Sequence, residues 1–320
     1  ALMKKHGIPI YTNIADTLTL GTGKLAVDGV LLVAEHGKYP SNKSGNVIWP
    51  KRRMFEEITK VFRDSNASVP VFCDKHLADN WRDAKWLFDE AGQLNAPLMA
   101  GSSLPGLWRK PQIDVKRGAK LTQMVAISYH TLSAYGFHAV EMVQCLAERR
   151  ASGETGVRQG RCISGDAVWK AVADGTIDES LLQAAVVPLE RSPVKQSKKS
   201  LRELAKNPTA MIIDYRDGFR ASILTLNGAA SEWSVAWHEA GDIKATMFWT
   251  QEARPFMHFT CLVKGAERMF HTGQPAWPAE RTLYTSAILD AALISLKQDG
   301  APVPTPYLAL PYQSGWTWQQ

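Results

Sequence analysis

The sequence predicts an α/β protein in which a parallel sheet is followed by a second α/β domain with a large, mostly antiparallel open sheet. Up to about residue 100, short apolar runs alternate with amphipathic segments of helical spacing, which is the pattern of βαβ units. Later segments alternate apolar and polar residues, as antiparallel strands with one covered face do. The change of pattern predicts two domains, residues 1–118 and 119–320.

Length and composition agree with a folded protein of this size. The chain has 320 residues, of which 45% are apolar and 21% charged, so it can bury a substantial core. No apolar run approaches the 18 or so residues of a membrane span, which argues against an integral membrane protein. The net charge of +6 comes from scattered basic residues, and neither a basic stripe nor a nucleic-acid-binding module is evident.

The N-terminal elements follow from their hydrophobic patterns. The continuous apolar run at 27–34 predicts a buried parallel strand, and apolar residues at helical spacing predict a helix over 51–63. The pattern then repeats. It predicts a strand at 69–73, a helix at 80–93 and a strand at 97–100.

The C-terminal elements begin with one more strand and a long helix. The strand is expected at 124–129 and the helix at 136–150, where apolar residues share one face. Alternating segments then predict further strands, at 211–215, 220–226, 233–238 and 256–263. A last helix is expected over 281–297.

Parallel sheets bind their ligands beyond the carboxyl ends of the strands. The residues at those positions are Glu35, His36, Asp74, Lys75, His76 and Ser102. A lysine in such a cleft can hydrogen-bond a hydroxyl and help to remove its proton. By spacing alone, Lys75 also fits a solvated loop lysine, and Glu35 and His36 also fit a solvated turn.

A second candidate group lies at the start of the helix near residue 136. His138 and Glu141 are three residues apart, so their side chains share one helical face and can touch. A carboxylate can fix the tautomer and orientation of an imidazole, as acid–base catalysis requires. A buried histidine satisfied by the backbone is the alternative interpretation.

The cysteine and histidine spacings exclude two further kinds of site. Four cysteines lie far apart without C-x-x-C spacing, which predicts free thiols and a cytoplasmic location. His36, His76 and His138 fall on separate predicted elements without ligand spacing, so no metal site is expected.

Several segments resemble the glucose–fructose oxidoreductase and inositol dehydrogenase family (Gfo/Idh/MocA). They are residues 6–11 (HGIPIY), 27–30 (VDGV), 70–78 (PVFCDKHLA), 97–101 (PLMAG) and 136–141 (GFHAVE). The resemblance implies a Rossmann-like parallel sheet, N-terminally incomplete, and a C-terminal open sheet that often forms the oligomer interface. It also implies NAD or NADP as cofactor and a hydroxyl of a sugar, cyclitol or glycoside as the reacting group.

The resemblance assigns roles residue by residue. Lys75 takes the place of the lysine in the family's Glu-Lys-Pro motif, which contacts the nicotinamide ribose and the reacting hydroxyl. His138 matches the acid–base histidine of the Gly-x-His-x-x-Asp motif, and Glu141 replaces its aspartate and is expected to orient His138. The expected cofactor-binding residues are Glu35, His36, Asp74, Lys75 and Ser102. The expected substrate-binding residues are His76, Trp108 and Tyr135, with Trp108 chosen because aromatic faces stack on sugar rings.

The sequence departs from the family at its start. A Gly-x-Gly-x-x-Gly turn opening a helix has no counterpart, and alignment with the family places Ala1 near the end of the second helix. The expected activity is an NAD(P)-dependent oxidoreductase with Lys75 and His138 as an acid–base pair. The alternatives are a redox-neutral glycoside-cleaving enzyme with recycled NAD and a non-catalytic relative that binds a carbohydrate or a protein. A small sugar or cyclitol substrate and a homo-oligomer, dimer or tetramer, formed through the C-terminal sheet are also expected, with no nucleic acid and no membrane.

Overall fold

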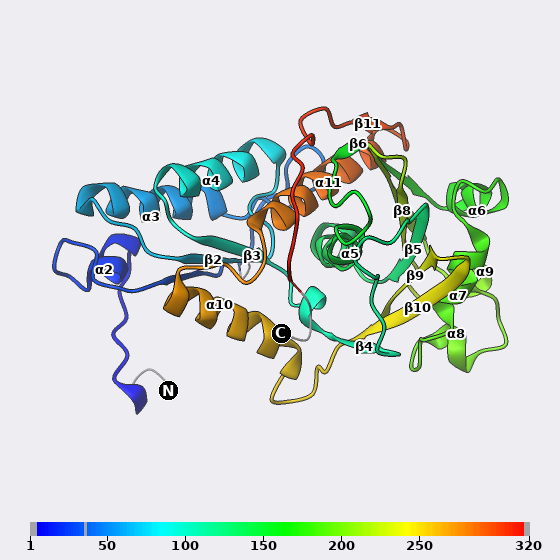
Figure 1. Cartoon of the computed structure of the whole chain (residues 1–320), viewed down its shortest axis with the longest axis horizontal. Helices are drawn as coiled ribbons and strands as arrows, with labels where there is room; N and C mark the ends of the chain where they lie inside the picture. The colour runs from blue at the N-terminus through cyan, green and yellow to red at the C-terminus, as the bar shows by residue number, and fades with distance from the viewer. Residues whose placement is uncertain (1–4, 35–36, 317–320) are drawn as a thin grey trace.

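A computed structural model of the chain describes residues 5–34 and 37–316. Two sheets lie beside each other in it, with helices above, below and between them (Figure 1). The smaller sheet is fully parallel, with strand order β1-β2-β3. Its strands are β1 (Val30–Leu32), β2 (Val71–Asp74) and β3 (Leu98–Gly101). This is the parallel sheet that the sequence predicts.

Helices cover both faces of the parallel sheet. The crossover helices α3 (Lys51–Ser65) and α4 (Trp81–Gln93) pack on one face (Figure 1). They bury apolar side chains such as Phe55 and Leu87 against β2 and β3. Because only one face of each helix is buried, its apolar residues recur at helical spacing, and this pattern predicted both helices. The other face lies against α10 (Thr260–Thr272). A short helix, α2 (Ile14–Thr19), precedes β1.

The larger sheet has eight strands in the order β11-β6-β7-β8-β5-β9-β10-β4. Its neighbours are antiparallel except for the parallel pair β5 and β8. The strands are β4 (Trp108–Lys110), β5 (Gln123–Ser128), β6 (Val157–Ser164), β7 (Thr209–Tyr215), β8 (Arg220–Thr225), β9 (Trp233–Glu239), β10 (Asp242–Trp249) and β11 (Val303–Pro304). The mostly antiparallel C-terminal sheet is therefore confirmed.

The larger sheet is covered on both faces as well. One face packs on α5 (Leu132–Ala147) and α11 (Ala279–Lys297). The other face packs on α6 (Asp166–Ala173) and α7 (Glu179–Val186) through a separate apolar core. The short elements that remain are α8 (Pro193–Gln196), α9 (Leu201–Leu204), η1 (Leu104–Gly106) and η2 (Met257–Phe259). No helix of the described residues is long and apolar enough to cross a membrane.

Helix α11 joins the two sheets. It contacts α4 and β3 on one side and α5 and β6 on the other. Leu283 belongs to the core of the parallel sheet, whereas Ile288 belongs to the core of the larger sheet. Because nearly every residue of α11 is buried, the edge of the parallel sheet is held in a fixed place beside α5.

Two predicted features differ from the structure. The strand expected at 256–263 is wrong, because this stretch forms η2 and the first turn of α10. Its apolar run is short enough to fit both the two-residue period of a strand and the 3.6-residue period of a helix. The buried residues Leu262, Ala266 and Met269 recur at helical spacing. Strand β4 lies before residue 118 but pairs with β10, so the larger sheet takes a strand from the first predicted domain. The boundary itself stays a prediction.

Candidate active site

A cavity of about 360 Å³ opens where the carboxyl ends of β2 and β3 meet the first turns of α5. The segment that links β10 to α10 closes its other side. This is the edge at which parallel sheets bind ligands. The lining residues are Trp49, Asp74, Lys75, His76, Ser103, Leu104, Tyr129, Ala134, Tyr135, His138, Trp233, Thr250, Glu252, His258 and Phe259.

Lys75 is held at the end of β2 by its backbone and by its neighbour. It adopts the left-handed conformation, with φ of 60°, and its N–H donates to the carbonyl oxygen of Gly101 at 3.1 Å. Its Nζ is 2.8 Å from Oδ2 of Asp74. Beneath this turn, Nζ of the buried Lys51 donates to the carbonyl oxygen of Asp74. A positive φ is costly for a non-glycine residue, and such conformations gather at functional sites.

His138 faces the same cavity from α5. Its Nδ1 is 2.6 Å from Oγ of Ser102, which leaves Nε2 as the ring nitrogen without a hydrogen-bond partner among residues 5–34 and 37–316. Burial, followed by the positive charge of Lys75, lowers the pKa of His138 to about 4. The imidazole is therefore neutral at pH 7 and able to accept a proton.

Ser102 allows either neutral tautomer of His138. Its Oγ accepts a hydrogen bond from the N–H of Leu104 at 3.0 Å, and a hydroxyl retains both a proton and a second lone pair. It can therefore donate to Nδ1 or accept from it. When Nε2 takes up a proton, Nδ1–H can donate to Ser102 without any movement of the ring.

Glu141 does not orient His138 directly, so that prediction is wrong. Its Oε2 accepts from the N–H of Ser102 at 3.3 Å, and its Oε1 accepts from Oγ1 of Thr282 at 3.1 Å. The side chain is completely buried, and burial raises the pKa of Glu141 to about 7. The helical spacing places both residues on one face, but the turn after β3 lies between them. Glu141 therefore reaches the imidazole only through Ser102.

A glycine is required where this carboxyl group meets β3. Gly101 has φ of 127°, and a Cβ there would lie 2.7 Å from Oε2 of Glu141. Any side chain would push the carboxyl group away from the turn that carries Ser102.

His76 forms part of the cavity floor. It is 1% exposed, and its ring stacks on Trp49 at 5.9 Å and meets the edge of Phe137 at 5.0 Å. Burial, with the nearby charge of Lys51, lowers its pKa well below 6.5. Nδ1 of His76 is buried without a hydrogen-bond partner among the described residues.

An aromatic group forms the wall next to His138. Tyr135 stacks on Trp233 with ring centroids 5.7 Å apart, and Tyr129 packs against Trp233 at 5.0 Å. Tyr135 is a sequence-predicted residue that does line the cavity. Tyr129 and Trp233, which also line the cavity, are not among the residues predicted from the sequence. Tyr129 directly follows β5, so the rule about strand ends would have found it.

The remaining predicted residues divide into three groups. Asp74, Lys75, His76, Tyr135 and His138 line the cavity, and Ser102 contacts His138 from beneath it. Trp108 does not line it: this residue lies on edge strand β4, opposite Trp249, and is 52% exposed. Strand β4 joins the larger sheet, so the structure does not bring Trp108 to this cavity, and its role in substrate binding stays a prediction. Glu35 and His36 lie outside the described residues.

Other lining residues could not be found by local spacing. Trp49 comes from the loop before α3, and Glu252 and His258 come from the segment between β10 and α10. Trp49 reaches the end of β2 by stacking on His76, and Glu252 and His258 reach it because α10 packs beneath the parallel sheet. No strand end or motif marks them in the sequence.

No protein-family model matches the sequence, and no curated protein sequence is similar to it. Solved structures share its fold. GenD2 from gentamicin A biosynthesis, in complex with NAD, is 11% identical with a TM-score of 0.60, over 95% of this chain and 84% of that one. A putative myo-inositol dehydrogenase from Sinorhizobium meliloti is 12% identical with a TM-score of 0.57, over 95% and 87%.

A third similar structure is the WlbA dehydrogenase from Bordetella pertussis in complex with NADH and UDP-GlcNAcA. It is 14% identical with a TM-score of 0.55, over 95% of this chain and 86% of that one. The chain thus has the fold of the inositol and sugar dehydrogenases. This confirms the fold class and the structural resemblance expected from the sequence.

Proposed function

We propose that this chain, with its dehydrogenase fold, is an NAD(P)-dependent oxidoreductase that acts on a hydroxyl group of a sugar, cyclitol or glycoside. One observation carries the proposal: Lys75 and a neutral His138 line the same cavity at the carboxyl ends of parallel strands. A cation and a free imidazole nitrogen are the two groups needed to polarise and deprotonate a hydroxyl.

In the proposed reaction the substrate hydroxyl donates to Nε2 of His138 and accepts a hydrogen bond from Nζ of Lys75. Asp74 holds Lys75 by an ion pair of 2.8 Å, which limits the movement of the ammonium group. As Nε2 takes the proton, the imidazolium is stabilised by a hydrogen bond from Nδ1 to Ser102. The aromatic wall beside Tyr135 and Trp233 excludes water from one side of the reacting carbon.

The described residues fit the reacting end of a nicotinamide dinucleotide. When bound, the cofactor would accept the hydride that leaves the carbinol carbon. The donors near its ribose would be Lys75 and the hydroxyl of Ser103, both of which line the cavity. The sequence contains no Gly-x-Gly-x-x-Gly turn for the pyrophosphate, so no residue is assigned to that end or to the choice between NAD and NADP.

The first test identifies any dinucleotide that the purified protein carries. The protein is denatured, the released ligand is identified by mass and absorbance, and the emptied protein is titrated with NAD and with NADP. Micromolar affinity for either supports the proposal. Absence of binding at millimolar cofactor contradicts it for this chain and favours the non-catalytic, carbohydrate-binding alternative.

The second test uses turnover of myo-inositol, scyllo-inositol and D-glucose, followed by dihydronicotinamide formation. His138→Asn should lower turnover by about 10²–10⁴-fold, as loss of a general base does, and Lys75→Met should lower it similarly. His271→Asn is the control, because His271 is exposed on α10 and does not line this cavity. Turnover near that of the wild type in both site variants would remove the proposed acid–base pair. Sugar release from a glycoside without net dihydronicotinamide formation would favour the redox-neutral alternative.

Two further expectations stay predictions. A homo-oligomer is expected from the resemblance, and light scattering of the purified protein measures it. Because α6 and α7 cover one face of the larger sheet, an interface on that side would include these helices. The cytoplasmic location rests on the spacing of the four cysteines, which contains no C-x-x-C pair.

A further inference from the structure

Lys51 is a buried cation directly beneath the turn that carries Lys75. It is the first residue of α3, and its side chain is completely buried. Its Nζ donates to the carbonyl oxygen of Asp74 at 2.5 Å. Burying an ammonium group costs free energy that its hydrogen bonds must offset. The fold bears this cost at the end of β2, one residue before Lys75.

The carbonyl group that Lys51 holds belongs to the same peptide unit as the N–H of Lys75. This N–H donates to the carbonyl oxygen of Gly101 at 3.1 Å. A trans peptide is planar, and its C=O and N–H point in opposite directions, so the two hydrogen bonds hold the plane at both of its edges. Rotation of the plane would break both bonds. They therefore maintain Lys75 in its left-handed conformation, with φ of 60°.

The N-terminal end of α3 supports the other end of the turn as well. Nζ of Lys51 lies 3.5 Å from Sγ of Cys73, which in turn donates to the carbonyl oxygen of His76 at 3.7 Å. The ring of His76 stacks on Trp49, two residues before Lys51. The turn at 74–76 is thus held through its backbone by Lys51 and through a ring by Trp49.

We propose that Lys51 is a positioning residue, which fixes the peptide between Asp74 and Lys75 and so holds the ammonium group of Lys75 in the cavity. The inference rests on the proposed function for the part that Lys75 plays in turnover. Lys51 is not among the residues that line the cavity, so it acts on a substrate through Lys75. Positions matter here because a displacement of about 1 Å at a reacting group can cost about 10²-fold in rate.

The first measurement is hydrogen–deuterium exchange of the whole chain, which needs no substrate. In Lys51→Met the amide of Lys75 should exchange at least about tenfold faster, because loss of a charge-assisted hydrogen bond frees the peptide to rotate. The amide of Val71, which donates to the carbonyl oxygen of Pro97 at 2.8 Å at the start of β2, should keep its rate. Lys60→Met is the matched control, because it removes an exposed ammonium group from the same helix.

The second measurement is turnover per folded molecule. Lys51→Met should lower kcat about 10- to 100-fold with KM within about twofold, and it should cause no further loss in a Lys75→Met background. A purely structural role would lower the free energy of unfolding and leave kcat per folded molecule unchanged. If Lys51→Met does not fold, Lys51→Gln takes its place, because glutamine keeps a buried N–H donor but is one atom too short to reach the same carbonyl group.

The outcomes separate this inference from the proposed function. An unchanged exchange rate of the Lys75 amide overturns the inference, whether or not the chain oxidises a polyol. Faster exchange with unchanged turnover overturns it too, as do additive losses of turnover in the double variant with Lys75→Met. Faster exchange in a chain whose wild type oxidises no polyol supports Lys51 as the residue that fixes this peptide and contradicts the dehydrogenase.

Discussion

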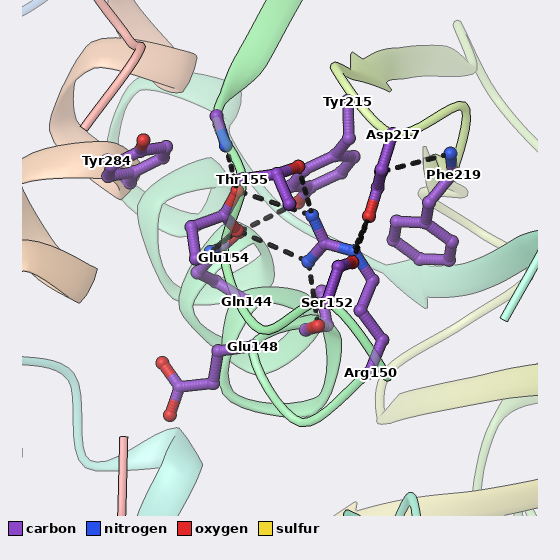
Figure 2. A network of polar contacts seen from close by, with 12 residues as sticks. Gln144, Glu148, Arg150, Ser152, Glu154, Thr155, Tyr215, Asp217, Phe219 and Tyr284 are labelled. Atoms are coloured by element: carbon purple, nitrogen blue, oxygen red, sulfur yellow. Dashed lines mark hydrogen bonds and ion pairs between the residues drawn. The ribbon is translucent and has the colours of Figure 1, made fainter. Parts of the chain in front are cut away.

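Buried polar groups lie at both ends of helix α5, but the two ends differ in how many of these groups have hydrogen-bond or ion-pair partners. Beyond its C-terminal end, Arg150 uses all five N–H donors, on Asp217, Glu154, Thr155 and the carbonyl oxygen of Ala147 (Figure 2). Tyr215, whose ring lies 4.7 Å from this guanidinium, donates its hydroxyl to Gln144. Each charge here has an opposite charge and a fixed hydrogen bond.

The N-terminal end of α5 leaves groups incompletely partnered. His138 lines the cavity, and Nδ1 of the buried His76 has no hydrogen-bond partner among the described residues. An unpartnered buried atom alone does not mark the site, because Nη1 of Arg281 lacks a partner as well. The two ends differ in charge pairing: Arg150 and Arg281 are each paired with a carboxylate, whereas His138 is a neutral imidazole that lines a cavity. Substitutions at the C-terminal end should cost stability, whereas those at the N-terminal end should cost activity.

The largest stability effect is expected for Arg281→Met. Arg281 is completely buried, and its guanidinium binds Glu148 through two hydrogen bonds, of 2.5 and 3.0 Å. Methionine preserves much of the volume but leaves Glu148 as a buried, unpaired charge, which costs about 3–5 kcal/mol of unfolding free energy. Urea denaturation measures it, and turnover per folded molecule should not change.

A double variant controls for lost packing. Replacing both partners, Arg281→Met with Glu148→Met, removes the unpaired charge and should recover most of the stability. An unfolding free energy of Arg281→Met within about 1 kcal/mol of the wild-type value would contradict this prediction. The ion pair of Arg281 with Glu148 would then contribute little to stability.

The next effect is a pH dependence of stability from Glu141. Its pKa is about 7 when folded and near 4.3 in an unfolded chain. Between these values the folded state keeps a proton that the unfolded state has lost, so this group makes stability fall as pH rises from about 4.5 to 7. Glu141→Gln removes that slope and should gain at most about 4 kcal/mol over the wild type across the window.

Urea denaturation at a series of pH values measures this difference, with Glu267→Gln as the control for loss of an exposed carboxylate. A difference between Glu141→Gln and the wild type that does not change with pH would mean that Glu141 is ionised throughout.

The smallest effect is expected from Ser102→Ala, which removes the hydroxyl that holds Nδ1 of His138. We expect turnover to fall about 10- to 150-fold with KM within twofold, because the residue acts through His138 and one hydrogen bond to a charged group is worth about 1.5–3 kcal/mol. In a His138→Asn background the same substitution should have no further effect on turnover. Additive losses in the double variant would show that Ser102 acts independently of the imidazole.

Much of the architecture could be predicted from the sequence because hydrophobic periodicity is local. The helix expected at 80–93 is α4, which Asn80 caps by accepting from the N–H of Asp83. The strands expected at 69–73 and 97–100 are β2 and β3, displaced by at most two residues at either end. The stretch at 256–263 failed because eight apolar-rich residues do not distinguish a strand from the start of a helix.

By itself, the sequence determined the strands that form the parallel sheet and the position of Lys75 at a strand end, because period and strand-end rules depend only on neighbouring residues. The tertiary structure decided the rest. Packing of α5 against the turn after β3 gave His138 the Ser102 hydroxyl instead of Glu141. Packing of α10 beneath the parallel sheet brought Glu252 to the cavity from a segment more than 170 residues away. Such long-range contacts depend on how whole elements bury their apolar faces, and no local spacing records that.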